Sequence, residues 1–379
     1  MSEGKQVVAR EPMRVLHVLG NLNVGGAETF IMNVYRHIDR SKVQFDFMVH
    51  AQDKGAYEKE AEFLGAKIYR MPAYNAINHV QYKRAWQNFF DNNREHEIIH
   101  GHMTSTAAIY LKIANKYGKT TIAHSHSTSS GDGLTAILKE HLQKQLPSTA
   151  AHLWACSEAA GVWCYSEENC RGSKYKVIKN AIDIEQFAFD ETRRDAKRKE
   201  LEIENKFVVG HVGRFFAPKN HNFLVDIFAN IYSKNNNAVL LLVGDGNLRS
   251  QIEQKVEKLG LANNVRFTGV RDDVAELLCA MDVFAFPSLW EGLPVTLIEA
   301  QANGLKCFVS DEITKEVNIT DFIENLSLHE TAEHWADKIT ACTCDYERKN
   351  MSDIMRQAGY DIKELTKSME ILYTGETYE

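Results

Sequence analysis

Short apolar runs alternate with amphipathic stretches along the whole chain. This alternation is typical of parallel β-strands that are joined by crossover helices. The predicted strands of the first half are 14–19, 45–50, 67–71, 97–102, 120–126, 152–157 and 175–180, and those of the second half are 207–213, 238–244, 265–269, 283–288 and 306–310. The pattern therefore predicts an α/β fold with two doubly wound parallel sheets.

The length of 379 residues exceeds that of one typical core and indicates two domains. The stretch 184–206 includes DETRRDAKRKE, and such a charge density is typical of a surface connection. We therefore predict a first Rossmann-like domain over 1–183, a second over 184–356 and a final segment over 357–379.

Open parallel sheets bind their ligands outside the carboxyl ends of the strands. The residues with informative chemistry follow the predicted strands at this edge, and a cleft between two facing sheets would gather them. They are Gly25 and Gly26, His102 and His126, Arg214 and Lys219, Gly244, and Glu291.

The stretch SLWEGLPVTLIEAQANGL, residues 288–305, places two carboxylates around a predicted helix start, with Pro294 in the first turn of that helix. Glu291 precedes the helix, and Glu299 would lie roughly 10 Å further along it. A glycosidase needs its acid and base closer together, so these carboxylates fit opposite ends of one elongated ligand. The helix N-terminus between them can bind phosphate, as in a nucleoside diphosphate sugar. The alternative is a surface helix with solvated glutamates.

Two further loops carry candidate phosphate contacts. Gly25 and Gly26 would let the backbone approach a phosphate or sugar, although a tight turn without a ligand also explains them. Arg214 and Lys219 in GRFFAPKN could bind a diphosphate together or be two solvated cations. D-x-D does not occur, so we predict that no metal holds the diphosphate and that no cofactor is required.

Two H-x-H pairs, His100 with His102 and His124 with His126, close two predicted strands. Histidine pairs are found in zinc sites, so a zinc hydrolase is one interpretation. The absence of acidic residues next to either pair argues against it. The other interpretations are polar side chains satisfied at strand ends, or cleft histidines that contact a sugar and its acceptor.

The charge is distributed unevenly. Residues 1–183 carry 22 Lys and Arg against 18 Asp and Glu, whereas the remainder carries 22 against 33. The first half can therefore face a membrane surface or a lipid phosphate, or simply carry scattered solvated charge. No nucleic-acid-binding motif accompanies this surplus. The start of the sequence lacks the apolar segment of a signal peptide, so we predict a cytoplasmic protein, peripheral on the inner membrane face at most.

Six segments together strongly resemble the family 4 retaining glycosyltransferases of GT-B fold, in their exopolysaccharide and capsular polysaccharide branch. They are GGAETFIMNVYRHID, IAHSHS, VIKNAIDIEQF, GRFFAPKNHNFL, VGDGNLR and SLWEGLPVTLIEAQANGL. The resemblance covers about residues 13–330. It implies that the first domain faces the acceptor, that the second binds the nucleotide-sugar, and that the last helix, within 357–379, crosses back to the first domain.

The resemblance also implies roles for single residues. Glu299 would bind the donor ribose, Glu291 the donor sugar, and His126, or less favourably His124, would lie near the reacting carbon. Arg214 and Lys219 would contact the diphosphate, and Gly25 and Gly26 would approach it from the first domain. The backbone N–H groups of Leu293, Val295 and Thr296 would lie near the phosphates, and the segment around Val270 and Val274 would border the base. Gly244 is a further donor-side position, and His102 and His124 are acceptor-side candidates.

The sequence thus predicts a metal-independent, retaining hexosyltransferase. It would move a sugar from a nucleoside diphosphate donor, a UDP-sugar, to a lipid-linked glycan. Two alternative functions remain possible on the sequence alone. A nucleotide-sugar epimerase of GT-B fold would act on the donor alone, and a nonenzymatic nucleotide-sugar-binding assembly protein would show no turnover.

Overall fold

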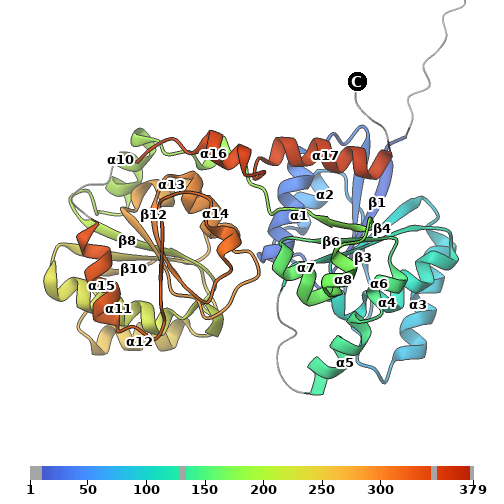
Figure 1. The fold of residues 1–379 in the computed structure, drawn as a ribbon, viewed down its shortest axis with the longest axis horizontal. Coiled ribbons are helices and arrows are strands. Elements are labelled where there is room, and N and C mark those ends of the chain that lie inside the picture. Colours follow the sequence, from blue (N-terminus) through green and yellow to red (C-terminus); the bar gives the residue numbers. More distant parts are fainter. Residues whose placement is uncertain (1–10, 128–133, 343–347, 376–379) are drawn as a thin grey trace, which may run out of the picture. The chain divides into compact units, whose positions relative to one another are not determined.

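The computed structural model describes residues 11–127, 134–342 and 348–375, and it divides into two compact units (Figure 1). The first unit comprises the chain up to Asn180 together with the segment from Ile362 onward. The second unit comprises Ala181–Asp361. The predicted boundaries, after residues 183 and 356, lie a few residues from these.

The first unit is built on a seven-stranded sheet whose pairings are all parallel, in the order β3-β2-β1-β4-β5-β6-β7. Its strands are β1 (Met13–Leu19), β2 (Val43–Val49), β3 (Ile68–Arg70), β4 (His96–Gly101), β5 (Thr120–Ser125), β6 (His152–Ala155) and β7 (Tyr175–Val177). Its helices are α1 (Gly26–His37), α2 (Glu58–Phe63), α3 (His79–Asn92), α4 (Thr104–Lys116), α5 (Leu134–Gln143), α6 (Leu146–Thr149), α7 (Glu158–Tyr165), α8 (Glu167–Cys170) and α17 (Ile362–Thr374).

The second unit contains a six-stranded parallel sheet in the order β10-β9-β8-β11-β12-β13. Its strands are β8 (Phe207–Val212), β9 (Ala238–Val243), β10 (Val265–Phe267), β11 (Val283–Phe286), β12 (Lys306–Ser310) and β13 (Ile323–Leu326). Its helices are α9 (Ile184–Phe187), α10 (Glu191–Glu200), α11 (His221–Lys234), α12 (Arg249–Lys258), α13 (Val274–Ala280), α14 (Val295–Ala302), α15 (Ala332–Ala341) and α16 (Ser352–Gln357), with 3-10 turns at Ala217–Lys219 and Lys315–Val317.

Each predicted strand overlaps an observed strand, and the structure adds β13, which the sequence did not predict. Its sequence, IENL, has two polar residues between two apolar ones, and only Leu326 is buried. The strand pairs with β12 at the edge of the sheet. Such a short edge strand does not need the long apolar run that marks a central strand.

The prediction that 184–206 is a surface connection is wrong. This stretch contains α9 and α10, and α10 packs against α13 within the second unit. Lys197 and Arg198 are buried, with Lys197 2.6 Å from Asp273 and Arg198 3.2 Å from Asp282. The charges of α10 are thus paired with acids of the domain, and the aliphatic parts of the basic side chains supply packing.

Helix α17 belongs to the first unit. The Glu370 carboxylate accepts a hydrogen bond of 2.8 Å from the backbone of Asp39, and the Tyr373 hydroxyl lies 2.9 Å from Nδ1 of His100. The predicted final segment began too early, because Gln357 is the last residue of α16 in the second unit. No helix in the described ranges has the length and apolar character needed to span a bilayer.

Candidate functional site

Two glycine-containing loops meet at the carboxyl ends of β8 and β9. Gly244 has a φ of +132°, and a Cβ atom there would lie 2.2 Å from the carbonyl oxygen of Gly213. The N–H of Phe215 donates to the carbonyl of Asp245 at 3.0 Å, and the N–H of Gly244 donates to Gly269 at 2.8 Å. A side chain at Gly244 would force these loops apart, so glycine is required there for packing as well as for backbone conformation.

The predicted cations follow β8. Arg214 is exposed, and its guanidinium carbon lies 4.8 Å from the centre of the Phe216 ring. The ammonium of Lys219 lies 4.7 Å from the centre of the Phe286 ring and 2.7 Å from Oε1 of Glu291. The side chains of this ion pair are 18% and 15% exposed, so both charges are largely shielded from water. The structure therefore brings Lys219 and Glu291 together, whereas Arg214 is exposed and lies over the Phe216 ring instead.

Helix α14 starts four residues after Glu291. Pro294 is its N-cap rather than its first residue, and the N–H of Leu297 already donates to the Pro294 carbonyl at 3.1 Å. No side chain caps this end, so the first N–H groups and the positive end of the helix dipole are suited to an anion. The hydroxyl oxygen of Thr296 is also buried without a hydrogen-bond partner. The predicted phosphate-binding residues Leu293, Val295 and Thr296 all lie on this segment.

Glu299 lies within α14 and is only 7% exposed. Desolvation by burial raises its pKa from 4.5 to about 7. A carboxyl group is costly to bury in this way unless something binds it. Glu299 is therefore a candidate ligand contact, because hydroxyl groups that donate to the carboxylate would offset this cost.

The two valines predicted to border the base follow β10. Val270 is 65% exposed and comes directly after Gly269, which accepts the Gly244 hydrogen bond. Val274 is the first residue of α13 and is partly buried. An exposed valine next to the glycine loops offers an apolar surface that a flat base could cover.

In the first unit, the loop after β1 is held by residues that follow β2. The carbonyl of Leu22 accepts from the N–H of Tyr57 at 2.9 Å, and a Cβ atom at Gly55 would lie 2.5 Å from the Leu22 backbone. This loop leads to Gly25, the N-cap of α1, and to Gly26, its first residue. A Cβ atom at Gly26 would meet nothing within 4 Å. Packing within the protein therefore does not require glycine at that position.

The two histidine pairs form one cluster in the first unit. His102 Nδ1 lies 2.8 Å from His126 Nε2, and His100 Nε2 lies 3.2 Å from His124 Nδ1. The rings of His100 and His102 stack at 4.3 Å, and those of His124 and His126 at 4.1 Å. The side chains are therefore satisfied mainly by one another, which agrees with the interpretation as polar side chains satisfied at strand ends.

Two members of the cluster were missed by the sequence analysis. His17 Nδ1 lies 3.0 Å from His102 Nε2, and Tyr373 contacts His100 from α17. A signal for His17 exists, because it is the polar residue in the otherwise apolar run 15–19. No local pattern marks Tyr373, since its contact joins positions 273 residues apart.

Ligand nitrogens of two histidine trios lie within 4.8 Å of one another, which is close enough for a metal ion. One trio is His17, His100 and His102, and the other is His102, His124 and His126. The nitrogen contacts of 2.8–3.2 Å are hydrogen-bond distances, and hydrogen bonding already accounts for them.

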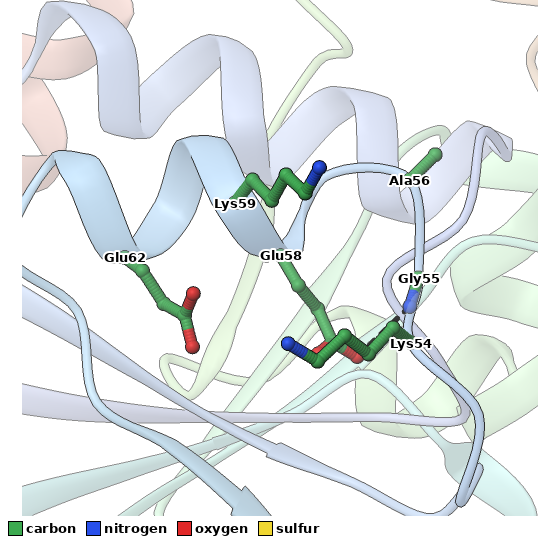
Figure 2. A pocket seen from close by; sticks show the side chains of 6 residues that line it. All are labelled: Lys54, Gly55, Ala56, Glu58, Lys59 and Glu62. Atoms are coloured by element: carbon green, nitrogen blue, oxygen red, sulfur yellow. Dashed lines mark hydrogen bonds between the residues drawn. The ribbon is translucent and has the colours of Figure 1, made fainter.

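A separate hollow of about 320 Å³ lies beside α2 in the first unit. Figure 2 shows Lys54, Lys59, Glu58 and Glu62 around it. The carboxylate of Glu58 already accepts from the N–H of Gly55 and from Arg70, at 2.9 and 2.7 Å. None of the predicted site residues lines this hollow, and we assign it no ligand.

The chain was compared with known proteins. The model of Glycosyltransferase Family 4 matches residues 24–186, and that of Glycosyl transferases group 1 matches residues 192–361. The putative glycosyltransferase EpsF of Bacillus subtilis (strain 168) is 35% identical over 363 residues, which cover 93% of this chain and 94% of EpsF.

Two further proteins are informative. The UDP-Gal:alpha-D-GlcNAc-diphosphoundecaprenol alpha-1,3-galactosyltransferase of Escherichia coli is 29% identical over 57% of this chain and 58% of its own length. The crystal structure of Anabaena HepE in complex with UDP and glucose superposes with a TM-score of 0.77 at 19% identity, over 96% of this chain and 100% of HepE. The likeness to HepE concerns the fold, with its two parallel-sheet α/β domains.

These matches and the two parallel sheets confirm the predicted fold class and the family resemblance: the chain is a glycosyltransferase of GT-B fold and belongs to family 4.

Proposed function

We propose that this glycosyltransferase transfers a hexose-type sugar from a UDP-sugar to a hydroxyl group of a lipid-linked glycan, with retention of configuration. The reaction would serve exopolysaccharide or capsular polysaccharide biosynthesis in the cytoplasm, at the inner membrane face. One observation carries the proposal. Glu291, on the loop that leads to the uncapped start of α14, pairs with Lys219 from the loop after β8, and α14 also carries the buried Glu299.

In this proposal each part of the donor is bound by a different part of the site. Glu299 accepts hydrogen bonds from the ribose hydroxyls, and the first N–H groups of α14 bind the diphosphate. Lys219 contacts the diphosphate oxygens and releases Glu291 to accept from hydroxyls of the sugar. The exposed Arg214 adds a second cation from the same loop.

Bond cleavage would leave a growing negative charge on the diphosphate. Lys219, Arg214 and the helix N-terminus stabilise that charge in the transition state, because all three are positive and held by the fold. The leaving phosphate helps to take the proton of the acceptor hydroxyl as this oxygen attacks from the same face. Gly25, Gly26 and the histidine cluster belong to the first unit, and the place of His126 near the reacting carbon is what the family resemblance implies.

The donor and acceptor classes draw support from two similar proteins. HepE was crystallised with UDP and glucose, and the Escherichia coli relative is named for UDP-Gal and a diphosphoundecaprenol acceptor. The surplus of basic residues in 1–183 fits an acceptor that carries a lipid diphosphate. A thermal-shift screen of UDP-, GDP-, ADP- and TDP-sugars identifies the donor, since a bound ligand raises the melting temperature.

Transfer is expected to persist in excess EDTA, because cations of the protein take the place of a metal at the leaving group. The measurement is transfer from the identified donor to a lipid-linked GlcNAc diphosphate, with and without EDTA. Loss of transfer that Mg²⁺ or Mn²⁺ restores would contradict the metal-free mechanism. Free nucleoside diphosphate without a transferred sugar, or an epimerised donor, would contradict the proposed function itself.

A further inference from the structure

Three histidines form a continuous hydrogen-bonded chain in the first unit. His17 Nδ1 lies 3.0 Å from His102 Nε2, and His102 Nδ1 lies 2.8 Å from His126 Nε2. His17 stands in β1, His102 directly follows β4, and His126 directly follows β5. The chain therefore runs from the sheet interior, where His17 is 0% exposed, to the partly exposed His126 at the carboxyl edge.

The three rings are neutral at physiological pH. Burial lowers the pKa of His102 well below its ordinary value and lowers those of His17 and His126 to about 3. A neutral imidazole carries one N–H and one bare nitrogen. His102 must therefore donate to one neighbour and accept from the other, so only two proton arrangements satisfy both hydrogen bonds.

In the first arrangement all three protons are on Nδ1. His17 donates to His102, His102 donates to His126, and the free nitrogen of His126 is an N–H donor. In the second arrangement all three protons are on Nε2. His126 then ends in a bare Nδ1, and His17 ends in an N–H at Nε2.

The surroundings of the two ends distinguish these arrangements. His17 Nε2 is buried without a hydrogen-bond partner, and the His17 ring packs against Phe45 with ring centres 4.1 Å apart. A proton at that nitrogen would be a buried donor that neither water nor a ligand can satisfy. His126 Nδ1 is buried as well and has no partner among the described residues, but its residue is partly exposed and lies at the carboxyl edge of the sheet. Because His17 is 0% exposed, only the His126 end lies where a bound ligand could offer an oxygen to the imidazole chain.

We propose that the imidazole chain fixes His126 as an Nδ1–H donor toward an oxygen atom of the bound sugar or phosphate. His102 and His17 are then positioning residues that act through His126. The identity of the ligand rests on the proposed function, whereas the proton arrangement does not. His126 consequently recognises an acceptor oxygen and does not serve as a base.

The direct test is the protonation state of each ring. Whole protein labelled with ¹⁵N-histidine is examined by long-range ¹H–¹⁵N NMR in the presence of UDP-glucose or UDP-galactose, and His126→Gln and His102→Gln assign the signals. The proposal predicts protonated Nδ1 and bare Nε2 at His17, His102 and His126. A bare Nδ1 at His126 in the complex overturns it, whether or not the protein transfers sugar.

Two substitutions at His17 distinguish a role in positioning His126 from a purely structural role. His17→Asn retains a donor close to the position of Nδ1, whereas His17→Phe retains the volume and removes the donor. Loss of one neutral hydrogen bond predicts that His17→Phe lowers kcat/KM about 3- to 10-fold and reduces the Nδ1-protonated fraction of His126, while His17→Asn keeps both. Equal losses in the two variants, in step with lower melting temperatures, would assign His17 a structural role only.

Metal analysis of the purified protein completes the test. Stoichiometric zinc that is lost in the His102→Gln variant would overturn the proposal, because a metal would occupy the lone pairs that the hydrogen bonds require. Metal-free protein with the predicted NMR pattern supports it. Absence of sugar transfer would contradict the proposed function and leave the protonation result standing on its own.

Discussion

Glu299→Gln is expected to weaken binding of the donor UDP-sugar about 10- to 100-fold, since it removes charge-assisted hydrogen bonds worth about 1.5–3 kcal/mol. The reason is the burial of Glu299 in α14, where only ligand hydroxyls would compensate its desolvation. The measurement is calorimetric titration of the variant with the UDP-sugar. Glu257→Gln is the matched control, because Glu257 is exposed on α12 of the same unit.

The ionisation of Glu299 should also make the affinity for the donor depend on pH. Burial raises the Glu299 pKa to about 7, so the carboxyl group is largely protonated below that pH and must ionise to accept from two hydroxyls. Donor affinity of the unmodified protein should therefore rise between about pH 6 and about pH 8, and that of Glu299→Gln should stay constant. A UDP-sugar is the suitable probe because its doubly esterified phosphates do not titrate in this range. Equal affinities for the unmodified protein and Glu299→Gln would remove Glu299 from the site.

Lys219→Ala is expected to lower kcat about 100- to 1,000-fold and donor affinity by less than about 10-fold. Lys219 stabilises a charge that is largest in the transition state, so its loss affects the chemical step more than ground-state binding. Arg214→Ala should act in the same direction. Lys258→Ala is the control, because Lys258 is an exposed lysine at the end of α12.

A second variant tests whether the loss arises from Glu291. Lys219→Ala leaves the Glu291 carboxylate without its cation, 2.7 Å away, and this carboxylate could repel the diphosphate. If repulsion were the cause, Lys219→Ala combined with Glu291→Gln would turn over as fast as Glu291→Gln alone. The account predicts no recovery, since the cation itself is missing. Wild-type kcat in Lys219→Ala would place the stabilising cation elsewhere.

The sequence predicted the two parallel sheets because each central strand is a short apolar run between amphipathic stretches. The predictions from the sequence were wrong or incomplete where the local composition does not show how a segment packs in the folded protein. The basic side chains of α10 appear solvated in sequence, yet Lys197 and Arg198 are buried against Asp273 and Asp282. β13 escaped prediction because an edge strand can remain polar.

In the candidate site, too, features of the local sequence could be predicted, whereas contacts between distant positions could not. The apolar pattern and Pro294 marked the helix start after Glu291, and Pro294 is the N-cap of α14. The ion pair between Lys219 and Glu291 could not be predicted, because it joins positions 72 residues apart through the alignment of β8 with β11. His17 was overlooked because its partner His102 becomes a neighbour only when β1 pairs with β4.

The central claim is retaining transfer from a UDP-sugar, and the configuration of the transferred sugar tests it most directly. The measurement is the one-bond C1–H1 coupling in the NMR spectrum of the product formed from an α-linked UDP-sugar and a lipid-linked GlcNAc diphosphate. The account predicts an α-linked product. A β-linked product, or a donor consumed without any glycosidic product, would contradict it.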